Sequence, residues 1–430
     1  MTGRAWHVSA LIGLLVFLGL LTRNGNVLLL ALPFVIYLGA SALSAPAEDM
    51  RVYVKHALSA NHGIADKPVH VSVVVQSQGA GLEELRVEDC VTPPLAISEG
   101  EASRSEPLPA GARLELEYDA YGQRGEYFFQ GTHLTASDHF GLFQVQRWFD
   151  TSDRLLIYPE AARLRHVAIR PLRTVGFSGP IPARRGGSGT DFYGIRQYQT
   201  GETLRRINWR VTARHYRTIF TNEFERESVA DVGLILDVRD QSDILTAEGK
   251  LSEYSVQAAG SLARLFLKEG HRVGLVAYGY GITQAFPGYG AVQLERIMAT
   301  LARAQTGTSF AFENLGSLPT RFFPPQSQLV IVSPLLPEDL FGLLRLASLG
   351  YSILVVSPDP IHFEVRTMRS TENLEMPLRL ARIERAVLLG KLRHVGIAVA
   401  EWQTDQPLDQ TLYSSLARQP LRQHLTRMAQ

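Results

Sequence analysis

Two apolar runs near the start of the chain constrain the fold most. The first run, residues 6–22, is interrupted by only two polar positions before its end, and the second, residues 27–43, contains no charged residue. As helices rising about 1.5 Å per residue, each would reach roughly 25 Å, close to what a bilayer core requires. A short polar stretch, Thr22 to Asn26, separates them and has a glycine in a turn position. Residues 1–46 are therefore predicted to form a transmembrane helical hairpin.

A secretory signal peptide is the competing interpretation of the first run, with Arg4 as its basic start. The second run would still anchor the chain, so the hairpin is the simpler prediction. Arg4, Arg51 and Lys55 lie outside the hairpin turn, whereas only Arg23 lies in it. This excess of positive charge favours a cytoplasmic body on a protein of the plasma membrane.

The overall composition excludes several classes of protein. With 45% hydrophobic residues and a formal net charge of +1, the chain is neither disordered nor globally basic. A single cysteine, Cys90, rules out an internal disulfide framework and any zinc or iron–sulfur site built from several cysteines. The histidines are scattered without a zinc-binding spacing.

Residues 51–160 have the pattern of an all-β domain. The stretch from Leu114 to Asp119 alternates apolar and polar residues strictly, and turn signals recur about every ten residues. This spacing is typical of an antiparallel β-sandwich. No acid–base pair or metal-binding spacing occurs in it, which indicates a spacer or binding module.

Residues 230–400 change to a longer period in which apolar strands alternate with helices. The predicted strands are residues 232–237, 273–278, 328–333 and 352–357, and the predicted helices lie near 247–268, 294–304 and 337–349. Continuous apolar strands alternating with helices predict a doubly wound α/β domain. No phosphate-binding glycine motif follows any of these strands, so no nucleotide or other cofactor is predicted. Residues 401–430 are expected to form a helical tail.

The densest motif lies in residues 161–229, between the two domains. Its distinctive positions are Asp191, Phe192, Arg196, Tyr198, Gly201, Arg205, Arg206, Trp209, Ala213, Arg214, Glu223 and Glu225. In this order and spacing the segment resembles the family catalogued as domain of unknown function 58. Residues 124–127 and 138–143 resemble the end of that family's β-domain, and the two apolar runs match its layout.

This resemblance implies a membrane-anchored protein without an established reaction. Members of the family are similar to proteins that carry a von Willebrand factor A-like domain, and their genes commonly lie beside MoxR-type AAA+ ATPases. The implied function is that of a non-enzymatic interaction or assembly factor working with such an ATPase. An enzyme acting on an anionic substrate and a structural protein of the cell envelope remain the alternatives.

A von Willebrand factor A domain that binds magnesium uses Asp-x-Ser-x-Ser after its first strand, with a threonine from a later loop, because a hard cation takes oxygen ligands. Here Asp237 and Thr308 stand at two of these positions. Arg239 and Gln241 replace the two serines, and Arg239 places positive charge where the cation would bind. A degenerate site without metal is therefore predicted, with Asp237 capping the following loop. A nonstandard site completed by Asp240 or Asp243 is the open alternative.

The charge of residues 161–220 allows three interpretations. Twelve arginines stand against two acidic residues, Asp191 and Glu202. The arginines either pair internally with nearby acids and fix the motif to the α/β domain, or form a surface for an acidic protein or anionic lipid. Nucleic acid is a less favoured third partner, because no recognition module accompanies the charge.

Overall fold

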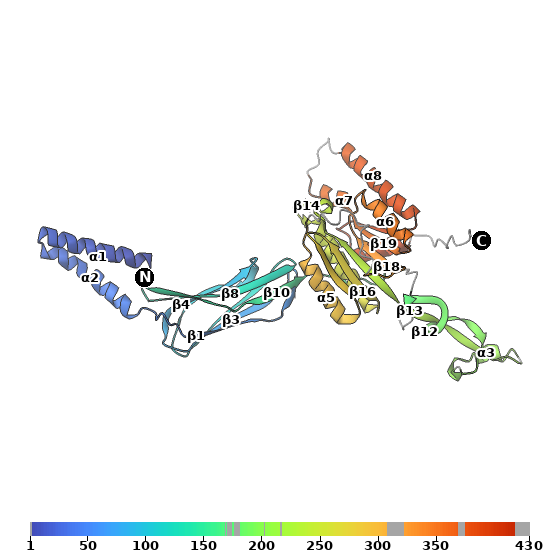
Figure 1. The fold of residues 1–430 in the computed structure, drawn as a ribbon, viewed down its shortest axis with the longest axis horizontal. Coiled ribbons are helices and arrows are strands. Elements are labelled where there is room, and N and C mark those ends of the chain that lie inside the picture. The colour runs from blue at the N-terminus through green and yellow to red at the C-terminus, as the bar shows by residue number, and fades with distance from the viewer. Residues whose placement is uncertain are drawn as a thin grey trace. The chain divides into compact units, whose positions relative to one another are not determined.

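The computed structural model divides the chain into two units, residues 1–158 and residues 159–430 (Figure 1). The described residues are 2–167, 169, 174–175, 181–201, 203–215, 217–307, 322–368 and 375–417. For residues 174–175, 181–193 and 223–228 only the backbone is described.

The first unit begins with a hairpin of two helices, α1 (Gly3–Thr22) and α2 (Gly25–Leu43), which lie against each other (Figure 1). Asn24 caps α2 by accepting a hydrogen bond from the backbone of Asn26, which makes the turn tight. Both helices are long and apolar enough to cross a bilayer, and only 11% of each apolar stretch is buried within the protein. The two predicted apolar helices are confirmed, and each begins a few residues earlier than the pattern indicated.

The rest of the first unit consists of two β-sheets that share one core. The first sheet has the order β1 (Val52–Leu58), β3 (Val69–Ser77), β7 (Arg113–Tyr121) and β5 (Ala96–Gly100). The second has the order β2 (His62–Ile64), β10 (Asp153–Tyr158), β8 (Gly125–Ser137), β4 (Leu82–Thr92) and β6 (Ser103–Leu108), with β9 (Gln144–Phe149) beside β8. Alternate residues of the long strands face inward, so Val71 and Val73 of one sheet enter the same core as Leu85 and Phe129 of the other.

The second unit is built on a sheet whose order is β17 (Ile282–Gly288), β16 (Arg272–Tyr278), β13 (Phe220–Asp237), β18 (Gln328–Val332), β19 (Ser352–Pro358) and β20 (Ala398–Trp402). All neighbouring pairs in this order are parallel except β16 with β17. A small hairpin of β14 (Leu245–Thr246) and β15 (Gly249–Lys250) follows β13. The sheet's last strand extends past residue 400, into the region where a helical tail was predicted.

Helices cover this sheet. They are α4 (Leu251–Lys268), α5 (Gly290–Arg303), α6 (Asp339–Ser348), α7 (Pro360–Val365), α8 (Glu375–His394) and α9 (Leu408–Ala417). Ile235 and Val355 pack with Leu343 of α6 and Leu389 of α8. Neighbouring residues of a strand point to opposite faces of the sheet. Leu234, which is as buried as Ile235, therefore points to the other face, where α4 packs.

The central strand β13 has two roles along its length. Its second half, from Asp231 onward, pairs with β16 and β18 inside the sheet. Its first half pairs with β12 (Ile181–Gln197), while β11 (Thr174–Val175) pairs near its middle. The chain between β12 and β13 forms two short helical turns, η1 (Leu204–Arg206) and α3 (Trp209–Thr212). The predicted motif segment and the predicted α/β domain are thus joined by one continuous strand.

Candidate functional site

The strand order identifies one candidate site at the carboxyl ends of β13 and β18. Chain connections leave β13 toward β16 on one side and leave β18 toward β19 on the other. Open α/β sheets bind their ligands at such a reversal of strand order, because the diverging loops leave a crevice there. Asp237 ends β13, and Ser333 directly follows β18.

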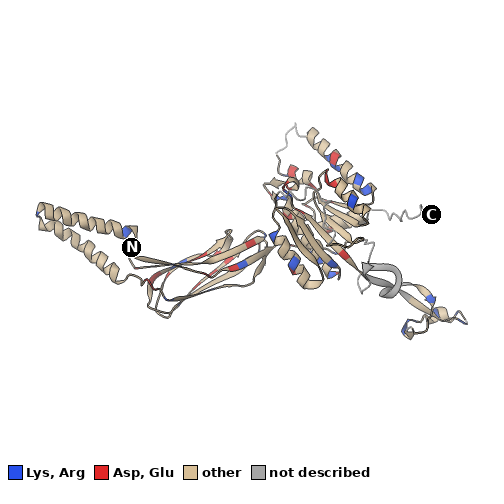
Figure 2. Cartoon of the chain, in the orientation of Figure 1, with Lys and Arg blue, Asp and Glu red and all other residues tan. Residues whose placement is uncertain are grey.

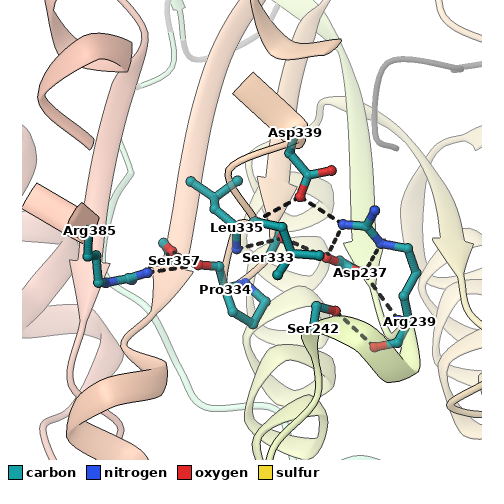
Figure 3. A network of polar contacts seen from close by, with 10 residues as sticks. Asp237, Arg239, Ser242, Ser333, Pro334, Leu335, Asp339, Ser357 and Arg385 are labelled. Atoms are coloured by element: carbon teal, nitrogen blue, oxygen red, sulfur yellow. Dashed lines mark hydrogen bonds and ion pairs between the residues drawn. The ribbon is translucent and has the colours of Figure 1, made fainter. Parts of the chain in front are cut away.

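The guanidinium of Arg239 fills this position (Figure 3). Its Nε and Nη2 each donate to a different carboxylate oxygen of Asp237 at 2.8 Å. Nη2 also donates to Asp339 at 2.8 Å. All three residues are buried, with no more than 3% of each exposed. A protein cation therefore joins two carboxylates in the crevice.

Further hydrogen bonds hold the two carboxylates of this cluster in place. The Ser333 hydroxyl donates to Asp237 at 2.7 Å and accepts from the backbone of Leu335 at 3.0 Å. The backbone N–H of Leu336 donates to Asp339 at 3.0 Å. Burial acts to lower the pKa of Arg239, but the hydrogen bonds and charges of the two aspartates outweigh it and raise that pKa above its ordinary value. The guanidinium therefore stays charged.

These residues do not fit a divalent cation. Asp237 uses both carboxylate oxygens and Asp339 uses Oδ2 on Arg239, and the guanidinium lies where a cation would have to bind both residues. Among the described residues, no group of three or more His, Cys, Asp or Glu side chains is placed to hold a metal ion. Thr308, the other position considered for a metal, lies outside the described residues.

A second buried arginine, Arg385 of α8, holds the same loop from the other side (Figure 3). It donates to the Pro334 carbonyl at 2.8 Å, to the Ser357 hydroxyl at 3.0 Å and to Glu401 at 2.7 Å. The loop between the two arginines contains Leu335, whose φ of 64° is rare for a residue with a side chain. Arg239 and Arg385 thus lie on the two sides of a strained turn at the carboxyl end of β18.

The sequence pattern indicated Asp237 and the charge of Arg239, but missed Asp339 and Arg385. Neither belongs to a local motif, since Asp339 lies 100 residues after Arg239. The available signal was that Asp339 soon follows the predicted strand at residues 328–333, as Asp237 ends the predicted strand at residues 232–237. Parallel neighbours end at the same edge, so acids that follow such strands are candidates for one cluster.

The second candidate site is the tip of the β12–β13 hairpin, defined here as residues 194–222. It is a folded unit. Asn208 caps α3 by accepting from the Val211 backbone at 3.1 Å, and its amide group donates to Asn222 at 2.7 Å. The Thr221 hydroxyl donates to the Arg206 carbonyl at 3.1 Å, and Ile207 is 6% exposed. Polar side chains within the motif therefore build the tip.

Other motif residues face solvent. Trp209 and Leu204 are each 68% exposed, and Ile219 is 45% exposed. The exposed polar and small motif positions are Gly201, Arg205, Arg210, Ala213 and Arg214, while Arg196, Tyr198 and Arg206 are half-buried. The sequence of the tip contains six arginines and one acidic residue, Glu202. Blue segments mark this charge at the tip in Figure 2.

The acidic motif residues cannot be assigned partners. The side chains of Asp191, Phe192, Glu223 and Glu225, like Glu202 itself, lie outside the described residues. The predicted internal pairing of these acids with Arg196, Arg206 and Arg214 therefore stays a prediction. Arg214 and Trp209 are exposed.

Residues 194–364 match the family described as "Protein of unknown function DUF58". The resemblance predicted from the motif is confirmed over this segment, which contains both the hairpin tip and the cluster around Arg239. The chain is also similar to the "Uncharacterized protein YeaD" of Bacillus subtilis (strain 168). The two are 26% identical over 337 residues, which cover 74% of this chain and 78% of that protein.

Similarities to solved structures are remote. One is the complex of zinc 2-glycoprotein with prolactin inducible protein from human seminal plasma, with a TM-score of 0.21, 10% identity, and coverage of 26% of this chain and 99% of that chain. Another is BslA, a bacterial hydrophobin, with a TM-score of 0.16, 8% identity, and coverage of 26% and 96%. Scores this low do not define the fold or function of this chain.

Proposed function

We propose that this protein is a membrane-anchored, non-enzymatic interaction or assembly factor that binds an acidic protein surface through its hairpin tip. The main observation in support is that Trp209 is exposed in a segment, residues 194–222, that is rich in arginine. Tryptophan and arginine are the residues that most often dominate binding energy at protein interfaces. Exposed apolar patches mark interaction sites, and this segment exposes Leu204 and Ile219 as well as Trp209.

The tip contains residues that stabilise it internally and other residues that are exposed, and this supports the proposal. Asn208 and Thr221 stabilise the tip from inside, whereas Trp209, Arg205 and Arg210 contribute little to its internal packing. Arginine's planar group suits bidentate contacts with carboxylates of a partner. A tip whose sequence has six arginines and one acid would repel basic partners and attract acidic ones.

The buried ion cluster at the sheet edge supports a non-enzymatic role. In the crevice where an α/β sheet usually binds its ligand, Arg239, Asp237 and Asp339 bond to one another. Their polar atoms are engaged and buried, which leaves them poorly suited to act on a substrate. The second unit on this proposal is a degenerate von Willebrand factor A-like domain used as a rigid scaffold.

The partner proposed from the family resemblance is a MoxR-type AAA+ ATPase. Such an ATPase works where ATP is available, so the proposal places the body of this protein in the cytoplasm and the hairpin in the plasma membrane. The two apolar helices support this anchoring by their length and composition.

The test is binding of the full chain in lipid nanodiscs to a purified MoxR-type ATPase, measured by biolayer interferometry. The variants Trp209→Ala and R205E/R210E should weaken binding at least ten-fold. Matched controls are Trp148→Ala, an exposed tryptophan of the β-domain, and R379E/R382E, an exposed arginine pair of α8. Absence of wild-type binding, or equal loss in the controls, would overturn the proposal. Binding of the tip to anionic vesicles in place of the ATPase would assign the surface to lipid.

A further inference from the structure

The loop between β8 and β9, residues 138–143, lies against the open end of the helical hairpin. We name it the collar loop. The backbone N–H of Thr2 donates to the Leu142 carbonyl at 2.9 Å, and the Thr2 hydroxyl lies 3.0 Å from the carbonyl oxygens of Gly141 and Leu142. Ala5, in the first turn of α1, is completely buried. The β-domain thus binds the start of the first apolar helix directly.

The collar loop also binds the end of the second apolar helix. The Ser41 hydroxyl of α2 donates to the carboxylate of Asp138, and both residues are completely buried. Asp138 further accepts from the backbone of Phe140 at 3.1 Å and of Phe143 at 2.6 Å. Burial acts to raise the pKa of Asp138, but these hydrogen bonds outweigh it and hold that pKa below its ordinary value. An ionised carboxylate therefore ties loop and helix together.

The loop reaches along α2 toward its apolar middle. Tyr37 lies four residues before Ser41, one turn deeper on the same face of the helix. The ring of Phe140 meets the ring of Tyr37 edge-on, with centroids 4.9 Å apart. Phe140 therefore contacts the hairpin about 6 Å further along its axis than Asp138 does, by the rise of four helical residues. It remains 39% exposed, and its ring also meets the ring of His139, with centroids 5.4 Å apart.

We propose that the collar loop is a membrane-contact site, with Phe140 and Tyr37 in the interfacial layer of a phospholipid bilayer. This inference rests on the proposed membrane anchoring. The proposal is supported by the contact of Phe140 with Tyr37, which makes the Phe140 ring a continuation of the apolar surface of the hairpin. This contact lies at the end of the hairpin where the chain must leave the bilayer. Trp6, 70% exposed in the first turns of α1, marks the same end. Tryptophan and tyrosine, here Trp6 and Tyr37, concentrate at this level in membrane proteins because their rings are amphipathic.

The collar loop would hold the β-domain close to the membrane surface. Hydrogen bonds from Thr2 and Ser41 and a ring contact with Tyr37 hold the collar loop. The β-domain therefore contacts both helices, in addition to its covalent link to the end of α2. The aromatic ring then adds a lipid contact. The collar loop, whose residues 138–143 belong to the family-like pattern, would thus position the β-domain at the membrane.

The experiment uses full-length protein with Cys90→Ser, reconstituted into phosphatidylcholine vesicles and carrying one new cysteine with a nitroxide label. The labelled positions are F140C, the matched control F128C and the anchor control L14C. Phe128 is 48% exposed and lies near the start of β8, far from the collar loop along the strand. Leu14 is an exposed residue of the middle of α1. Paramagnetic resonance then compares the accessibility of each label to oxygen, which enters lipid, and to a water-soluble nickel complex.

For F140C we expect an oxygen-to-nickel accessibility ratio several-fold above that of F128C and below that of L14C. If F140C matches F128C while L14C lies in lipid, the collar-loop site is overturned and the anchoring stands. If L14C is also aqueous, the anchoring itself is overturned. Should F140C unfold in a thermal melt, H139C reports the same depth, since His139 is exposed and leaves the Phe140–Tyr37 contact intact.

Discussion

Arg239 donates a 2.8 Å hydrogen bond to Asp339, which lies one hundred residues later in the chain. The bond joins the end of β13 to the first turn of α6, on the two sides of the point where the strand order reverses. Because Asp237 binds the same guanidinium, the chain supplies its own cation at this edge of the sheet. The stability of the second unit should therefore depend on this cluster.

Replacing Arg239 with methionine should destabilise the protein strongly. Asp237 and Asp339 would remain as two buried carboxylates without a counter-charge, which costs about 3–5 kcal/mol in the free energy of unfolding. Urea denaturation followed by tryptophan fluorescence measures this change. The exposed control Arg210→Met should shift the free energy by no more than about 0.5 kcal/mol. The triple variant D237N/R239M/D339N should recover most of the loss, and equal stability of both single variants would contradict the prediction.

Arg385→Gln should destabilise the protein by about 2–4 kcal/mol, because the Pro334 carbonyl and the Ser357 hydroxyl lose a charged donor inside the protein. The control is Arg382→Gln on the exposed side of the same helix. Arg239 and Arg385 hold one strained turn, so their effects should not add. A double-mutant cycle should give a coupling of about 0.5–3 kcal/mol, and strict additivity would argue against a shared turn.

His271 should make stability depend on acid pH. Burial first, and the nearby charge of His166 second, lower its pKa to about 4. Between its ordinary pKa of about 6.5 and pH 4 the unfolded chain binds a proton that the folded protein does not. Stability should therefore fall as pH falls through this window, by up to about 1.4 kcal/mol per pH unit, and level off below it.

The measurement for this prediction is the free energy of unfolding at several pH values between 7 and 4. The Glu269 carboxylate lies 3.6 Å from Nε2 of the His271 ring. His271→Asn should remove this part of the pH dependence, whereas the exposed control His139→Asn should keep it. Identical pH profiles for the wild type and His271→Asn would refute the assignment.

Asn208 and Trp209 should separate the stability of the tip from its surface chemistry. Asn208→Ala removes the cap of α3 and the bond to Asn222, which costs about 1 kcal/mol locally. Hydrogen exchange at the backbone of Val211 and Phe220 should then accelerate. Trp209→Ala should leave both rates unchanged, because its side chain is mostly in solvent. Equal acceleration in the two variants would mean that Trp209 is part of the internal packing.

Much of the architecture could be predicted from local patterns. The two apolar runs became α1 and α2, and the strict alternation of residues 114–119 became part of β7, with Leu116 and Tyr118 inside. The continuous apolar stretch at residues 232–237 became the buried second half of β13. These patterns succeed because burial of a helix or strand face requires a fixed spacing of apolar side chains along the chain.

The sequence by itself determined the apolar hairpin, the β-rich segment, the alternating strands and helices, and the resemblance of residues 194–364 to the family of unknown function DUF58. Only the tertiary structure decided that Arg239 binds Asp339, that Arg385 holds the same turn, and that Asp138 bonds to Ser41. Each of these pairs joins residues far apart in the chain. Their proximity depends on strand order and loop packing, which no local spacing encodes, because a buried charge needs a partner but does not specify where in the sequence it lies.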